Sequence, residues 1–234
     1  MPVVEQMIVA FSRRPLNMSL TQGDTCSSLK NREMFLAQQE IDYRDLVCAR
    51  QVHGQAIALV GDKERGRGAC LSETAIADTD ALITATPGVP IAVFTADCLS
   101  VLLYDPEVPC VAAVHAGWRG TQGGILAKTI AGMKKEFHAH SETMRVFLGP
   151  CIRPCCYEVG EEFLRFFPAD VLAREGKYYF DLAEANKRQL FQSGIGAHQI
   201  VDEGFCTSCR ADEFFSFRRE GAGTGRLMSV IMIR

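Results

Sequence analysis

The segment of residues 91–124 constrains the fold most strongly, because it holds two apolar runs on either side of a short turn. The runs SVLLY and CVAAVHA are rich in residues that favour β-strands, and the intervening DPEV at residues 105–108 has the composition of a turn. This pattern predicts an antiparallel hairpin at the centre of the protein.

The predicted hairpin brings two reactive side chains together. If Tyr104 pairs with Pro109, Cys98 lies opposite His115. Directly opposed side chains are about 5 Å apart at Cβ, which suits two ligands of one metal ion or a thiolate–imidazole pair. A slip of one residue would instead send the two side chains to opposite faces of the sheet.

The residues after His115 predict an anion site. AGWRG is a short glycine-rich turn, and Thr121 is a candidate N-cap for a following helix. The free N–H groups of such a helix start, together with the guanidinium of Arg119, would hold a phosphate or carboxylate. A glycine-rich turn with a surface arginine is the simpler alternative. The predicted buried positions of the helix are Leu126, Ile130, Met133 and Phe137.

The rest of the chain mixes predicted strands and helices. Strands are predicted at residues 6–12, 46–58, 79–85, 91–94, 144–148, 178–181, 199–201 and 227–233, and helices at 24–40, 158–167 and 182–193. This order predicts an α+β fold, a layered α/β sandwich whose mixed sheet contains the central antiparallel hairpin. No compositional shift divides the chain, so we expect a single domain over residues 1–234. No G-x-G-x-x-G or Walker pattern indicates a nucleotide cofactor.

Composition restricts the class of partner. A net charge of −3 does not favour nucleic-acid binding, and no apolar run approaches the length of a membrane span. The start of the chain has no export-signal pattern. We therefore expect a cytoplasmic protein with a small-molecule partner, whose oligomeric state the sequence does not indicate.

Several polar residues are candidates for the site or for its support. QVHGQ places Gln51 and His53 in a predicted strand, and Asp80 opens the strand at 79–85. Asp78 and Asp80 are candidates either to orient a ligating histidine or to cap a turn. The charged, glycine-rich loop 61–72 is either a mobile lid or an inert surface loop. Arg32, taken alone, suggests a solvated helix face, and the arginines of FFSFRR suggest surface charge.

The ten cysteines have two possible explanations. Cys206 and Cys209 have C-x-x-C spacing, and with Cys151, Cys155 and Cys156 they would form a second zinc or redox cluster. Reduced, packed thiols are the favoured alternative, because the two segments are distant in sequence and lack a second C-x-x-C pair.

The motifs together resemble one family, the bacterial laccase-domain proteins. These are also called multicopper polyphenol oxidases or YfiH-type proteins, and are now classed as purine nucleoside phosphorylases. The matching motifs are NR at 31, QVHG at 51, DALIT at 80, TADC at 95, HAGWRGT at 115, LGP at 148, CCYEVG at 155, FFSFRR at 214 and TGRLMSV at 224. The resemblance spans nearly the whole chain, except that the loop before Asn17 is shorter than is usual in the family.

The resemblance implies a zinc site at His53, Cys98 and His115, with copper as an alternative metal. It also implies phosphorolysis of adenosine, inosine, guanosine and methylthioadenosine, so that purine nucleoside and phosphate are the expected substrates, and deamination of adenosine. We expect catalytic roles for Cys98, His115 and Asp80, and substrate contacts from Arg32, Gln51 and Arg119.

The laccase name conflicts with the histidine count. A four-copper oxidase needs roughly ten histidine ligands, whereas the chain has five histidines. One N/N/S site with an open position suits zinc. The alternatives are a metal-free hydrolase in which His115 activates Cys98 toward an amide or cell-wall peptide, a copper-dependent polyphenol oxidase, and a non-enzymatic metal or redox module.

Overall fold

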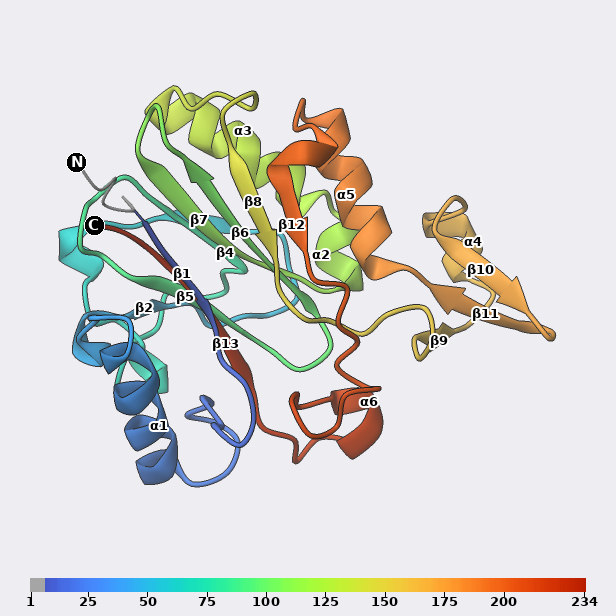
Figure 1. The fold of residues 1–234 in the computed structure, drawn as a ribbon, viewed down its shortest axis with the longest axis horizontal. Helices are drawn as coiled ribbons and strands as arrows, with labels where there is room; N and C mark the ends of the chain where they lie inside the picture. Colours follow the sequence, from blue (N-terminus) through green and yellow to red (C-terminus); the bar gives the residue numbers. More distant parts are fainter. Residues whose placement is uncertain (1–6) are drawn as a thin grey trace.

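The computed structural model describes residues 7–234 and contains two main β-sheets (Figure 1). The larger sheet has, in order, β12 (Ile200–Asp202), β8 (Arg145–Leu148), β6 (Leu99–Asp105), β7 (Cys110–Ala116), β4 (Ala81–Thr84) and β3 (Ile57–Leu59). The smaller sheet has β1 (Met7–Phe11), β13 (Leu227–Ile233), β5 (Ile91–Thr95) and β2 (Val47–Cys48). Both sheets combine parallel and antiparallel pairs.

The two sheets are the inner layers of a four-layer sandwich. Apolar side chains of both sheets, such as Leu102, Val111 and Ile231, form the core between them. On the outer side of the larger sheet lie α3 (Ile125–Phe137) and α5 (Leu182–Gln192). The smaller sheet is covered by α1 (Thr25–Ala37) (Figure 1). The predicted α+β layered sandwich is therefore confirmed.

The central hairpin forms between β6 and β7, but its predicted register is wrong by two residues. Ser100, not Cys98, pairs with His115, and Asp105 pairs with Cys110. The Asp105 carboxylate accepts hydrogen bonds from turn N–H groups, one of them that of Glu107 at 3.0 Å, and the four-residue turn lies at residues 106–109 rather than at the predicted 105–108. Because side chains alternate with a period of two, Cys98 remains on the same side as His115.

The first helix confirms one expectation and corrects others. The Asp24 side chain accepts a hydrogen bond from the N–H of Ser27, as expected of an N-cap. The helix ends at Ala37, three residues before the predicted end. Met34 is 48% exposed, and Arg32 is buried rather than solvated. The predicted first strand is β1, and Gln6 lies outside the described residues.

The helix after His115 is divided. A five-residue helix, α2 (Trp118–Gln122), comes first, and Gly124 then adopts a left-handed conformation before α3 begins. Thr121 lies within α2 and is not an N-cap. Leu126, Ile130 and Met133 are buried as predicted, and Phe137 is partly buried.

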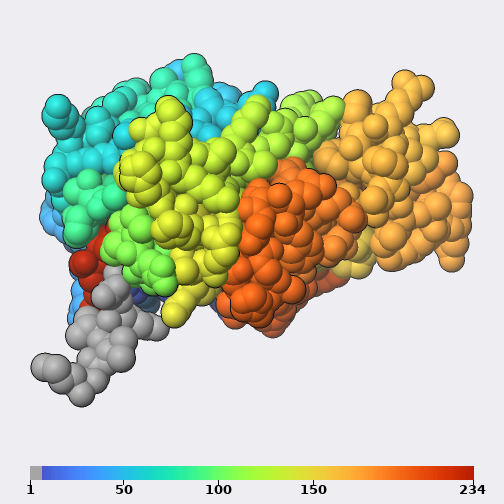
Figure 2. All heavy atoms as spheres, turned by 90° about the horizontal axis from the view of Figure 1, so that it is seen from above, coloured from blue at the N-terminus to red at the C-terminus, as the bar shows by residue number. Residues whose placement is uncertain are grey.

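Residues 158–181 form an arm of which only the last strand, at 178–181, was predicted. In place of one helix at 158–167 stand β9 (Glu158–Val159) and α4 (Phe163–Phe166), followed by β10 (Val171–Arg174) and β11 (Lys177–Phe180). The rings of Phe163 and Phe167 pack on Phe180, which folds the segment back on itself. The arm projects beyond α5 at one end of the molecule (Figures 1 and 2). The last short helix is α6 (Phe217–Glu220).

Within residues 7–234, every helix is too short or too polar to cross a membrane.

Candidate metal centre

Three predicted ligands meet at one end of the central hairpin. The ligand atoms of His53, Cys98 and His115 all lie within 4.8 Å of one another, and the two imidazole rings are 4.8 Å apart at their centroids. His115 belongs to β7, Cys98 directly precedes β6, and His53 comes from the loop between β2 and β3. His115 is buried and His53 is exposed. This N/N/S set fits a metal ion.

Asp80 holds the two histidines in place. Its Oδ1 accepts from His115 Nδ1 at 2.7 Å and from the His53 main-chain N–H at 3.0 Å. Its Oδ2 accepts the N–H of Val52 at 3.2 Å and that of Gly54 at 2.7 Å. With Nδ1 donating to the carboxylate, the other ring nitrogen of His115 is free to bind a metal. Asp80 is fully buried. Its geometry therefore supports the role of orienting a ligating histidine.

The QVHG segment is a loop, not the predicted strand. His53 has a left-handed backbone, with φ of 59°. The Gln51 side chain makes the two hydrogen bonds to Phe94 that the backbone of a neighbouring strand would make. Its Nε2 donates to the Phe94 carbonyl and its Oε1 accepts the Phe94 N–H, both at 2.8 Å. Gln51 therefore fixes the loop to β5, and its amide is engaged by the backbone. Asp78 is exposed and pairs with Arg50 at 3.1 Å.

Two glycines of HAGWRG allow the turn to pass close to the site. A Cβ on Gly117 would lie 3.1 Å from the Cys98 sulfur and 3.2 Å from Cδ2 of His53. A Cβ on Gly120 would lie 2.9 Å from the carbonyl oxygen of Gly54. A side chain at either position would push the ligands apart.

The electrostatics favour the ligand form of Cys98. Burial by itself raises the pKa of the thiol, but the charge and hydrogen bond of His115, with a further hydrogen bond from His53, lower it to about 6. Burial lowers the pKa of His115, whereas Cys98 and Asp80 raise it to about 9. In the protein without metal, this mutual attraction favours a thiolate–imidazolium pair, and the thiolate is the form that binds metal or acts as a nucleophile.

The three ligands open into a pocket of about 720 Å³. This volume lies in the usual range for small-molecule sites. The pocket combines aromatic and cationic side chains. Its aromatic members are Phe94, Trp118, Tyr157 and Phe217, and its arginines are Arg32, Arg50, Arg119, Arg218 and Arg226.

The two predicted anion-binding arginines differ in their surroundings. Arg119 is exposed, lies over the Trp118 ring at 4.4 Å, and makes no side-chain hydrogen bond to the part of the chain that the structure describes. Arg32 is 2% exposed, and its guanidinium donates to three backbone carbonyls. These acceptors are Met18 at 2.9 Å, Gly68 at 2.9 Å and Ala69 at 2.7 Å. Arg32 also ties the predicted lid loop 61–72 to the body of the protein.

Sequence reasoning missed Arg226, although it lies in the TGRLMSV motif. Its side chain lines the pocket while Nη1 donates to the carbonyls of Thr224 and Gly225. Burial lowers the pKa of Arg226, although the nearby charges of Cys98 and Asp97 act to raise it. It is thus a partly buried cation near the thiolate.

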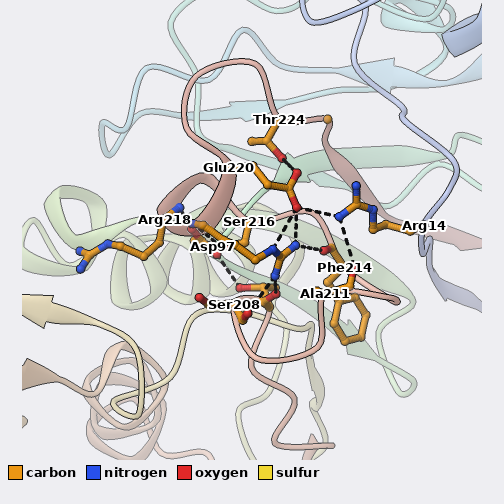
Figure 3. Close-up of polar contacts among 12 residues, drawn as sticks. Arg14, Asp97, Ser208, Ala211, Phe214, Ser216, Arg218, Glu220 and Thr224 are labelled. Atoms are coloured by element: carbon orange, nitrogen blue, oxygen red, sulfur yellow. Dashed lines mark hydrogen bonds and ion pairs between the residues drawn. The ribbon is translucent and has the colours of Figure 1, made fainter.

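The FFSFRR segment is positioned by an internal arginine. Arg219, predicted as surface charge, donates to the carbonyls of Thr207, Ser208 and Phe214 and pairs with Glu220 (Figure 3). The Asp97 carboxylate accepts the N–H of Arg218 at 2.6 Å. These contacts place α6, with Phe217 and Arg218, at the pocket wall. Phe214 and Phe215 are buried as expected, whereas Phe217 is 52% exposed.

The remaining histidines do not extend the metal site. Within residues 7–234, only two groups of three or more potential ligands occur, the His53–Cys98–His115 set and a cluster of four cysteines. His138, His140 and His198 belong to neither. The described residues therefore provide no multicopper cluster. Of the cysteines predicted for a second cluster, Cys155, Cys156, Cys206 and Cys209 come together, while Cys151 is buried beside them.

Comparison with known proteins agrees with this architecture. A purine nucleoside phosphorylase of Bacteroides thetaiotaomicron is 35% identical over 221 residues, which cover 90% of this chain and 82% of that protein. The adenosine deaminase RL5, from an unknown prokaryotic organism, is 34% identical over 219 residues, which cover 89% of this chain and 83% of that protein.

A solved structure and a family model extend the match. The crystal structure of YlmD from Geobacillus stearothermophilus superposes with a TM-score of 0.92 at 32% identity, covering 100% of this chain and 94% of that one. The model of the family described as multi-copper polyphenol oxidoreductase laccase matches residues 9–234. By this match and by the identity of its relatives, the chain belongs to the multi-copper polyphenol oxidoreductase laccase family.

Proposed function

We propose that this protein is a zinc-dependent purine nucleoside phosphorylase. The observation that carries the proposal is the His53–Cys98–His115 set at the base of a pocket lined with arginines and aromatic rings. Relatives of similar length are named purine nucleoside phosphorylase, which agrees with it. Inosine, guanosine, adenosine and methylthioadenosine are the proposed substrates, with phosphate as the second substrate.

The donor set fits zinc. Two imidazole nitrogens and a thiolate are three of the four ligands of a catalytic zinc with one open position. Asp80 fixes the tautomer of His115, as carboxylates do for metal-binding histidines. A bound Zn²⁺ would supply a Lewis acid at the base of the pocket. Copper also accepts this ligand set, and metal analysis of protein purified without added metal separates the two.

The pocket supplies contacts for both substrates. The exposed ring of Phe217 and the half-buried ring of Trp118 are the aromatic surfaces that suit the purine ring. Arg119 and Arg226 would hold phosphate beside C1′ of the ribose through charge-assisted hydrogen bonds. In phosphorolysis a phosphate oxygen forms a bond to C1′, the bond from C1′ to the purine nitrogen breaks, and its electron pair leaves with the purine. Burial raises the pKa of Tyr157, so this phenol remains protonated at the pocket wall.

The test is to incubate pure protein with inosine, with and without phosphate. Hypoxanthine and ribose 1-phosphate should appear only when phosphate is present. Release of free ribose without phosphate would show a nucleoside hydrolase instead. Ammonia and inosine formed from adenosine would add the deaminase activity for which one relative is named. The P-C-x-x-C half of the zinc deaminase pattern is absent from the sequence, and its H-x-E triplet at residues 140–142 lies outside the His53–Cys98–His115 set.

The second candidate is a metal-free cysteine hydrolase. It is favoured by one observation: Cys98 is paired with His115, which Asp80 in turn orients. That is the arrangement of an activated nucleophile, its base and an orienting group. His53 argues for the metal, because a hydrolase of this type needs no second imidazole at the sulfur. Turnover of an amide by chelator-treated protein, with covalent labelling of Cys98, would favour the hydrolase.

We expect the substitution Arg119→Ala to raise the phosphate KM about tenfold, because one charge-assisted contact contributes about 1.5–3 kcal/mol. The nucleoside KM should change less. Arg174→Ala is the matched control, since Arg174 is also exposed and lies over an aromatic ring, Tyr179 at 5.6 Å, but on the distant arm. Initial rates over a range of phosphate concentrations give the phosphate KM of each of the two variants. An unaltered phosphate KM in Arg119→Ala would remove this residue from the phosphate site.

Arg32→Lys should mainly reduce stability. A lysine cannot reach the three carbonyls that the planar guanidinium contacts. We expect the free energy of unfolding to fall by about 2 kcal/mol, in line with the loss of buried charged hydrogen bonds. Urea denaturation measures this loss, and kinetics should show a smaller change in phosphate KM than Arg119→Ala. A large rise in phosphate KM with unchanged stability would instead establish the direct phosphate contact expected from the sequence.

A further inference from the structure

Four cysteines from two distant segments meet outside the pocket. The sulfurs of Cys155, Cys156, Cys206 and Cys209 all lie within 4.8 Å of one another. The Cys209 sulfur is 3.5 Å from that of Cys155 and 3.3 Å from that of Cys156. All ten cysteines of the chain are free thiols. Four thiols thus converge on one point without a covalent bond between them.

The two segments are joined by the backbone next to the cysteines. Cys151 and Cys206 form a parallel β-bridge, in which the N–H of Thr207 donates to the Cys151 carbonyl at 3.0 Å. Arg153 lies between the bridge residue Cys151 and the cluster residue Cys155. Its guanidinium donates two hydrogen bonds to the Asp202 carboxylate, at 2.5 and 3.1 Å, and the Arg153 side chain is 13% exposed. The approach of the two segments is therefore built into the fold.

The C-x-x-C loop is also fixed from its other side. Arg219 Nη1 donates to the carbonyls of Thr207 and Ser208, the two residues between Cys206 and Cys209, at 2.8 and 2.9 Å (Figure 3). The Thr207 hydroxyl donates to Asp97 at 2.6 Å. The loop conformation that aims both sulfurs at the first segment is thus held by contacts that do not involve the cysteines themselves.

We propose that Cys155, Cys156, Cys206 and Cys209 form a structural zinc site. A tetrahedral Zn²⁺ with four Zn–S bonds of about 2.3 Å requires sulfurs about 3.8 Å apart. The observed spacings lie around this value, and the cage is sized for one ion rather than for a cluster of several metal atoms. Four protein ligands leave no open position, which is the property of a structural rather than a catalytic zinc. On binding, the four thiols release their protons to solvent.

The site would support one wall of the pocket. Ile152 and Tyr157, on either side of the first cysteine pair, both line the pocket. The main-chain N–H of Ile152 donates to the carbonyl of Asp97 at 2.9 Å, and Asp97 directly precedes the ligand Cys98. A zinc ion joining the two segments would therefore stabilise the region that positions Cys98. This inference does not depend on the nucleoside activity.

The experiment uses the full chain in a Cys98→Ala background, in which the pocket ligand set is broken. This protein should retain one zinc per chain by elemental analysis, and adding Cys209→Ser should remove it. Cys26→Ser is the matched control, because Cys26 is an exposed thiol on α1 far from the cluster, and it should leave the zinc in place. Replacement of zinc by Co²⁺ should give the intense absorption of a tetrahedral cobalt tetrathiolate.

Circular dichroism checks that each variant is folded, and Cys155→Ser provides a second variant at an exposed ligand. Zinc absent from the Cys98→Ala protein, or retained when Cys155 and Cys209 are both replaced, would overturn the proposal. Iron in place of zinc, or disulfides among the four cysteines detected by mass spectrometry, would also overturn it. Loss of phosphorolysis in every assay would leave these metal measurements unaffected.

Discussion

Cys98→Ala is expected to remove the metal from the pocket and to slow inosine phosphorolysis about a thousandfold. The thiolate is one of the three proposed ligands, and the two imidazoles that remain would not complete the site. Lewis-acid stabilisation contributes several kcal/mol to a transition state, and about 4 kcal/mol corresponds to a factor of about a thousand. Metal content and kcat, measured on the same preparation, test both parts of the expectation.

Cys70→Ala is a suitable control for Cys98→Ala, because Cys70 is another partly buried thiol but belongs to neither ligand group. It should leave metal content and kcat near those of the unaltered protein. Cys98→Ala with full metal content and activity would disprove the ligand assignment. Loss of activity with full metal content would indicate that Cys98 acts as a nucleophile, as the hydrolase candidate requires.

The second large effect is expected for Asp80→Asn, which should lower metal affinity and kcat by about 10- to 100-fold, the usual range for carboxylates that orient metal-binding histidines. In the unaltered protein the Asp80 carboxylate accepts hydrogen bonds from several N–H groups. In Asp80→Asn an NH₂ group would face some of these donors, and the amide would no longer favour the tautomer of His115. Competition with a chelator measures the affinity. A role limited to folding would lower stability without changing the metal affinity of the folded protein.

Asp78→Asn is the matched control for Asp80→Asn. It lies two residues away, but it is exposed and pairs only with the exposed Arg50. The metal affinity and kcat of the Asp78→Asn protein should equal those of the unaltered protein. Asp80→Glu tests the positioning role further, because it restores the charge but displaces it by one methylene. Recovery of part of the metal affinity is expected, and an affinity no better than that of Asp80→Asn would show that geometry outweighs charge.

The local chemistry of the sequence determined much of this protein. Alternating and β-rich runs predicted most strands, including β13 at its observed ends, and Asp24 predicted the start of α1. The histidine count by itself argues against a multicopper centre. These features depend on neighbours along the chain, so a local pattern is sufficient to predict them. The single-domain assignment and the cytoplasmic location remain predictions.

The hairpin shows the limit of local information. Its existence followed from composition, but its register depended on the Asp105 carboxylate binding the N–H groups of the turn. The resulting shift was two residues, which is one full period of a strand. Cys98 and His115 therefore stayed on one face, and the predicted metal site survived an incorrect register.

Only the tertiary structure decided the roles of the polar side chains. Gln51 and Arg32 line the pocket, and their contact with substrate remains a prediction, but both are also held by backbone groups that lie 14 to 43 residues away. Arg226 was overlooked, and it lies at the pocket beside residues more than a hundred positions earlier in the chain. The four cysteines looked too distant in sequence to form a cluster, and the Cys151–Cys206 bridge brings them together. Such contacts form when sheets and loops pack, and no spacing within a single segment encodes them.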